Sequence, residues 1–262
     1  MVFRRPSRWV IALPVALALA ALSGCGSGAS GTSDPPGAGG EVTVFAAASL
    51  TESFTELGTV FEAGHPGVTV RFNFGSSATL AQQIVQGAPA DVFAAASPAT
   101  MKTVTDASRT AGSPATFARN RLQIAVPRDN PAKVDELKDL ADPGVKVALC
   151  AEQVPCGAAA AKALRAAGLE VTPVTLEQDV KATLTKVELG EVDAALVYRT
   201  DVIAAAGKVT GISFPEADQA VNDYPIAALA DAPAGDLAEE FVDLVLSRQG
   251  KDVLAKVGFD VP

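Results

Sequence analysis

EVTVFAAASLTESF, residues 41–54, contains the two patterns that decide the fold. Its first part, residues 42–47, is a short apolar run with β-branched side chains, which is typical of a buried strand. Ser49 follows, and Glu52 stands three residues later, a spacing that predicts a capping box at the start of a helix running toward Gly64. A strand that passes directly into a helix is the unit from which α/β proteins are built.

The same alternation of strands and helices recurs toward the end of the chain. We expect further strands at residues 68–74, 91–96, 121–127, 145–150 and 194–198. We expect further helices at residues 79–86, 158–167, 181–189 and 237–257. This order predicts an α/β fold with mostly parallel sheets. A length of 262 residues and this number of strands favour two lobes over a single sheet.

Four of the strand-to-helix junctions carry small, hydroxyl or capping residues where the helix begins. They lie at residues 48–49, 76–77, 155–157 and 179–180. Free backbone N–H groups and the helix dipole make such helix ends suitable for binding anions. Serine and aspartate also cap helices without any ligand, and the spacing alone does not say whether the four junctions meet.

The N-terminal segment has the pattern of an export signal. Three arginines precede an apolar run at residues 9–22, too short for a comfortable membrane span, so residues 1–24 are predicted to be a signal peptide. The sequence LSGC at residues 22–25 resembles the bacterial lipoprotein signal, which implies lipidation of Cys25 and anchoring on the outer face of the cell membrane. The alternative is an ordinary secreted protein with an unrelated cysteine. Residues 25–40, rich in Gly, Ser and Pro, are expected to form a flexible linker.

The composition excludes several classes of protein. With 48% hydrophobic and 19% charged residues, the chain does not have the composition of a disordered protein. A net charge of −9 and an aromatic content of 5% argue against nucleic acid as a partner. One histidine and three cysteines leave almost no ligands for a zinc site.

The two cysteines that remain beside Cys25 are Cys150 and Cys156. An oxidising compartment would permit a disulfide between them. Two separate buried thiols are the alternative.

Several motifs, in order through residues 41–262, resemble those of the periplasmic molybdate-binding proteins of ABC importers. The stretches are VFAAASLTESF (44–54), FGSSATLAQQI (74–84), GAPADVFAAAS (87–97), QVPCG (153–157), EQDVKATLTKVELGEVDAALVYRTDV (177–202), YPIA (224–227) and VGFDVP (257–262). The resemblance implies a type II periplasmic binding protein, in which crossover strands join two α/β lobes and the ligand lies in the cleft between them. Lobe one would comprise residues 41–119 plus 227–262, and lobe two residues 120–226.

The resemblance also implies five positions that hold the oxyanion. Ser49 and Ser77 would each give a hydroxyl and a backbone N–H, Cys156 and Val180 a backbone N–H, and Tyr198 its phenol O–H. Molybdenum would be present only inside the bound oxyanion, without direct protein ligation and without any cofactor. The protein would act as a monomer that delivers molybdate, and tungstate as well, to a transporter permease and its ATPase.

Two details weaken the local match around the second serine. Ser76 is the obvious rival of Ser77 for the same role, and many members of the family carry a further serine where this chain has Ala78.

Other functions remain open alternatives. The chain could bind another oxyanion such as sulfate, or it could be a surface lipoprotein without a transport ligand. A serine hydrolase using Ser49 or Ser77 would need a base, but the only histidine, His65, lies in a GHPG turn and no GxSxG motif occurs. The spacing of Cys150 and Cys156 is not the CxxC spacing of oxidoreductases. We therefore expect a binding protein and not an enzyme.

Overall fold

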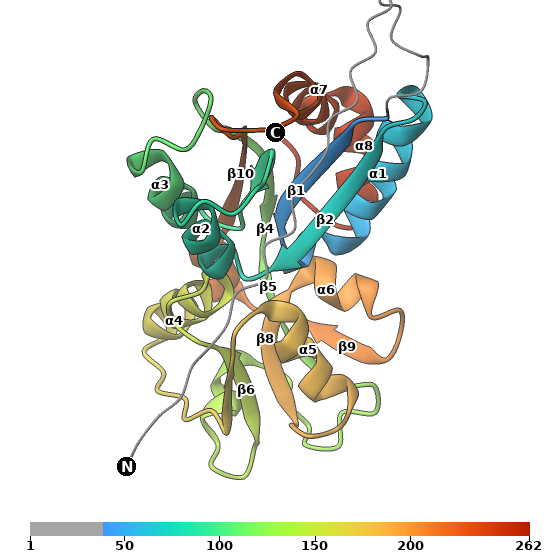
Figure 1. Cartoon of the computed structure of the whole chain (residues 1–262). Helices are drawn as coiled ribbons and strands as arrows, with labels where there is room; N and C mark the ends of the chain where they lie inside the picture. Colours follow the sequence, from blue (N-terminus) through green and yellow to red (C-terminus); the bar gives the residue numbers. More distant parts are fainter. Residues whose placement is uncertain (1–38) are drawn as a thin grey trace, which may run out of the picture. The chain divides into compact units, whose positions relative to one another are not determined.

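The computed structural model describes residues 39–262, and its strands form two separate five-stranded sheets (Figure 1). The predicted signal peptide, the predicted lipidation site Cys25 and all but the end of the predicted linker lie outside the described residues. Among the residues described, no helix is long and apolar enough to cross a membrane. The expectation of two α/β lobes is confirmed by the two sheets; the exact lobe boundaries stay a prediction.

The sheet of the first lobe has β1 near its centre. Its strands, in spatial order, are β2 (Thr69–Gly75), β1 (Glu41–Ala47), β3 (Val92–Ala94), β10 (Asn222–Ala228) and β4 (Ala115–Asn120). Val42, Val44 and Ala46 of β1 are buried in one core and Phe45 in another. Burial on both faces explains why β1 reads as a continuous apolar run.

Helices cover both faces of this sheet (Figure 1). One face packs against α1 (Thr51–Gly64), α7 (Gly235–Leu246) and α8 (Arg248–Lys256). The other face packs against α2 (Ser77–Val85) and α3 (Pro98–Asp106).

The second lobe is built around one continuous apolar core. Its strands, in spatial order, are β7 (Thr175–Glu177), β6 (Val147–Cys150), β8 (Ala194–Tyr198), β5 (Leu122–Pro127) and β9 (Val209–Ile212). Its α-helices are α4 (Pro155–Ala167), α5 (Val180–Glu188) and α6 (Arg199–Ala204). Three short 3-10 helices complete the described elements of the chain: η1 (Ala48–Leu50), η2 (Leu137–Ala141) and η3 (Pro215–Ala220).

Two sequence-based expectations about the elements were wrong. The sheets are not mostly parallel, because β10 runs antiparallel to both of its neighbours and so does β5. The expected helix at residues 237–257 is two helices, because Ser247 has an extended backbone and its hydroxyl accepts the N–H of Gly250 as the cap of α8.

The parallel strands place the helix starts that matter for function. β1, β2, β6, β7 and β8 are each followed by a helix, and the residues at these turns meet between the lobes. Ligands of open α/β sheets bind at the carboxyl ends of strands. The place where these turns meet is therefore the expected ligand site of this fold.

Candidate functional site

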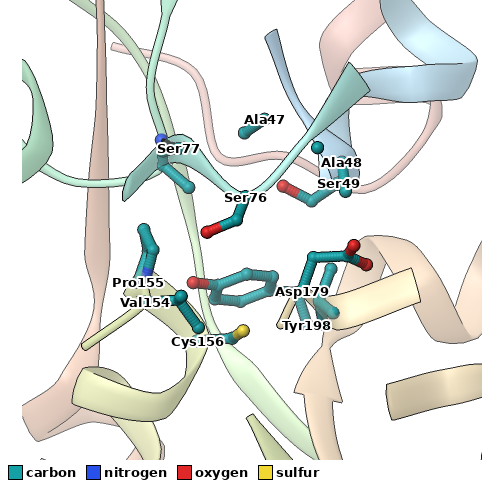
Figure 2. Close-up of a pocket in the computed structure, with 13 residues that line it drawn as sticks. Ala47, Ala48, Ser49, Ser76, Ser77, Val154, Pro155, Cys156, Asp179 and Tyr198 are labelled. Carbon is teal, nitrogen blue, oxygen red and sulfur yellow. Dashed lines mark hydrogen bonds between the residues drawn. The ribbon is translucent and has the colours of Figure 1, made fainter. Parts of the chain in front are cut away.

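A small cavity lies where the strand-to-helix turns of the two lobes meet (Figure 2). Its volume of about 20 Å³ leaves room for one compact group and not for an extended organic ligand. The lining residues are Ala47, Ala48, Ser49, Gly75, Ser76, Ser77, Ala96, Val154, Pro155, Cys156, Asp179, Val180 and Tyr198. All five residues predicted to hold the oxyanion are among them.

Ser49 does not form the capping box that the sequence suggests. The α1 helix begins at Thr51 with Leu50 as its N-cap, and no side chain caps it. The Ser49 hydroxyl instead hydrogen-bonds the Tyr224 hydroxyl at 2.8 Å, with both side chains buried. This bond orients the serine at the cavity. The expected capping box was wrong, and Ser49 is one of the lining residues.

The start of α2 brings two serines to the cavity. Ser77 is 1% exposed, and its hydroxyl oxygen accepts the Ala96 N–H at 3.0 Å. The proton of this hydroxyl can still be donated to another group. Ser76 is the N-cap residue, yet its side chain caps nothing. Within α2 the backbone hydrogen bonds begin with the Leu80 N–H donating to the Ser76 carbonyl, so the earlier N–H groups of the first turn have no helical acceptor.

The loop from β6 to α4 is fixed by a disulfide between Cys150 and Cys156, which confirms the first of the two alternatives for these cysteines. Cys156 is 3% exposed and lies in the first turn of α4. A Cβ built on Gly157 would lie 2.0 Å from the Ala151 carbonyl oxygen, so only glycine permits this close approach. The covalent bond and the glycine together hold the first turn of α4 against the end of β6.

Val180 begins α5, where the preceding residue is a true cap. The Asp179 carboxylate accepts the N–H of Ala182 at 2.9 Å. Asp179 is the only carboxylate among the lining residues, and Figure 2 shows it turned away from Ser76 and Tyr198. It caps the helix, and Val180 beside it lines the cavity.

Tyr198 ends β8 and is held by an asparagine from the other sheet. The Asn222 side-chain amide donates to the Ala96 carbonyl at 2.7 Å and to the Tyr198 hydroxyl at 2.8 Å. Because a carbonyl only accepts, this contact fixes the orientation of the amide. The Tyr198 oxygen is thus an acceptor here, and its own proton remains for donation. Burial raises the pKa of Tyr198 well above its ordinary value, which keeps the phenol protonated.

An ion-pair cluster beside the cavity links the lobes. Lys181 Nζ lies 2.7 Å from Glu52 of α1 and 3.4 Å from Asp201 of α6. Burial lowers the pKa of Lys181, but the Asp201 and Glu52 carboxylates raise it by more. Burial raises the pKa of Asp201 to about 6, against the opposing effects of Lys181 and of the Tyr198 N–H, which donates to its Oδ2 at 3.2 Å. Asp201 therefore supports the backbone at Tyr198.

The electrostatic character of the cavity is that of neutral donors. Its lining residues include no lysine, arginine or histidine. Within residues 39–262, no group of three or more His, Cys, Asp or Glu side chains could hold a metal ion. Hydroxyls and helix N-termini attract an anion by fixed dipoles, so this arrangement can bind a small oxyanion.

Sequence reasoning missed the residues that hold the lining groups in place. Tyr224 and Asp201 appear in motifs but had no assigned role, and Asn222 lies in none of the motifs. Asp201 accepts the N–H of Tyr198, only three residues before it. Tyr224 and Asn222 act through partners distant in sequence: Ser49 for Tyr224, and Tyr198 and Ala96 for Asn222. Only the sheet pairing of β10 brings these groups to the cavity.

A comparison with protein families gives one match over most of the chain. The model for bacterial extracellular solute-binding proteins matches residues 42–260.

Known relatives agree with that match. The molybdate-binding protein ModA of Mycobacterium tuberculosis (strain ATCC 25618 / H37Rv) is 42% identical over 260 residues, which is 97% of this chain and 100% of the relative. Bacillus subtilis (strain 168) YvgL, named as a provisional ABC transporter substrate-binding lipoprotein, is 31% identical and covers 98% of each chain.

The fold also matches that of a solved structure. The Azotobacter vinelandii periplasmic molybdate-binding protein superposes with a TM-score of 0.74 at 23% identity, over 84% of this chain and 99% of that one. At this identity the likeness speaks for the fold alone, and it confirms the periplasmic binding protein architecture.

Proposed function

We propose that this chain, which belongs to the bacterial extracellular solute-binding protein family, captures molybdate and delivers it to an ABC importer. Membership of a solute-binding family makes the chain a binding protein and not an enzyme. The observation that carries the choice of ligand is the small cavity lined by neutral hydrogen-bond donors.

The chemistry of the cavity suits a tetrahedral oxyanion without protons. Molybdate at neutral pH is such a dianion and can only accept hydrogen bonds. The proposed donors are the hydroxyls and N–H groups of Ser49 and Ser77, the N–H groups of Cys156 and Val180, and the phenol of Tyr198. Each hydrogen bond to a charged acceptor contributes about 1.5–3 kcal/mol, and ordering and desolvation offset much of the sum.

Neutral donors also fit the acidic charge of the protein. The chain carries a net charge of −9, which would oppose an anion at long range. Local dipoles act over the first turn of a helix and need no net positive charge. Because no cation is among the lining residues, no ion pair holds the bound oxyanion, which favours its release to the permease.

The proposal also includes tungstate as a second ligand. Tungstate forms a tetrahedral ion of nearly the same size as molybdate, so we expect it to bind too.

A signal peptide at residues 1–24 would direct export of the protein, and a lipid on Cys25 would hold the binding domain near a permease and its ATPase. The named lipoprotein relative supports this anchoring.

Thermal unfolding with sodium molybdate, tungstate, sulfate and phosphate tests the ligand. At molybdate about 100-fold above its dissociation constant, the melting temperature should rise by about 5–10 °C, and tungstate should act similarly. No shift with molybdate would overturn the proposal. A larger shift with sulfate would assign the cavity to sulfate instead.

A further inference from the structure

Ser76 differs from the other serines of the cavity because its hydroxyl has no partner. The residue is 7% exposed, and its Oγ makes no hydrogen bond to any of the described residues. Ser49 and Ser77, by contrast, are bonded to Tyr224 and to the Ala96 N–H. A buried hydroxyl without a partner is uncommon in native proteins and calls for an explanation.

The explanation is not helix capping. Ser76 is the N-cap residue of α2, where a serine side chain ordinarily accepts an N–H from the first turn. The N-cap side chains of three other helices do so: Ser97 accepts from Thr100, Asp179 from Ala182 and Ser247 from Gly250. At α2 the corresponding bond is missing.

The Ser76 hydroxyl is turned toward the cavity instead. Figure 2 shows its oxygen directed away from Ser49 and toward the side of the cavity where the Tyr198 hydroxyl lies. This places the oxygen where the other proposed donors converge. Leaving such a group unpaired is unfavourable, and an acceptor in the cavity would satisfy it.

We propose that the Ser76 hydroxyl donates a hydrogen bond directly to the bound oxyanion, as a binding residue additional to the five that the family resemblance implies. This inference rests on the proposed function, because it needs an oxyanion in the cavity. Ser76 and Ser77 then have divided roles. The oxygen of Ser77 is engaged by Ala96, whereas Ser76 gives its only hydrogen bond to the ligand.

The substitution Ser76→Ala separates binding from capping. Titration calorimetry with sodium molybdate should show affinity about 10- to 100-fold below that of the wild type, the loss expected for one hydrogen bond to a charged acceptor. Without ligand, the melting temperature should stay equal or rise slightly, because no cap bond is lost and an unpaired buried hydroxyl is removed.

Ser247→Ala is the matched control, since Ser247 caps α8 and does not line the cavity. This variant should lower the melting temperature by about 2–5 °C and bind molybdate like the wild type.

The outcomes distinguish this inference from the proposed function. If the wild type itself shows no heat of binding with molybdate, the proposed function fails first. If the wild type binds and Ser76→Ala binds equally well, Ser76 is not a ligand. A fall in the melting temperature of ligand-free Ser76→Ala as large as that of Ser247→Ala would also overturn the inference, because it would show a capping role.

Discussion

The two sides of the cavity present the same kind of donor by different means. The first lobe contributes the hydroxyls of Ser49, Ser76 and Ser77. The second lobe contributes the helix starts at Cys156 and Val180, where the backbone and not the side chain faces the ligand in our proposal, together with one phenol. Side-chain identity should therefore matter most on the first side, and the path of the backbone on the second.

Gly157→Ala should have the largest effect, because it disturbs the backbone path of the second side. The new Cβ would lie 2.0 Å from the Ala151 carbonyl oxygen, so the loop from β6 to α4 must move. Although alanine is the better helix former, we expect a loss of about 3 kcal/mol or more in the free energy of unfolding and weaker molybdate binding. Denaturant titration and calorimetry measure the two effects.

Gly64→Ala is the control for this substitution. A Cβ on Gly64, at the end of α1, would have no atom within 4 Å. This variant should be as stable as the wild type or slightly more so. If Gly157→Ala were as stable as the wild type, the close packing of the loop from β6 to α4 would not be what positions the backbone of the second lobe at the cavity.

Asp201→Asn should change how stability depends on pH. Burial raises the pKa of Asp201 to about 6, above its value in an unfolded chain, so the folded state favours the protonated form. The associated stability is present below about pH 4 and is lost as pH rises through about 6. Relative to the Asn variant, the wild type should lose up to about 3 kcal/mol between these values.

Denaturant unfolding of both proteins at a series of pH values, without molybdate, tests this expectation. Groups facing Asp201 are Lys181, Glu52, Tyr198 and Tyr224, and the substitution leaves all of them in place. If the stability of the two proteins ran parallel across the range, Asp201 would not carry a raised pKa.

Val180→Ala should have the smallest effect on binding. Its side chain packs in the core of the second lobe, so truncation should lower the free energy of unfolding by about 2 kcal/mol. The N–H that we propose as a donor is unchanged, and the dissociation constant for molybdate should change by less than about threefold. A loss as large as that of Ser76→Ala would mean that the side chain shapes the site, and the contrast between the two sides would fail.

The sequence predicted the local elements well where one pattern dominated. The apolar runs of β1 and β8 and the alternation in β2 gave strands within a residue or two of their observed bounds. Prediction from the sequence failed where a side chain could bond either a neighbouring residue or a residue far away in the chain. Ser49 and Glu52 have the spacing of a capping box, but Ser49 bonds Tyr224 and Glu52 pairs with Lys181 of the other lobe.

The alternation of strands and helices, and the hydroxyl or small residues at the helix starts, could be predicted from sequence because both depend on neighbouring residues. The family resemblance added the five site positions. Three features emerge only in the folded chain: four helix starts and Tyr198 line one cavity, β5 and β10 run antiparallel to their neighbours, and Ser76 is the serine of this cavity without a partner. These features depend on contacts between residues far apart in the chain, such as Asn222 with Tyr198, and no local pattern records them.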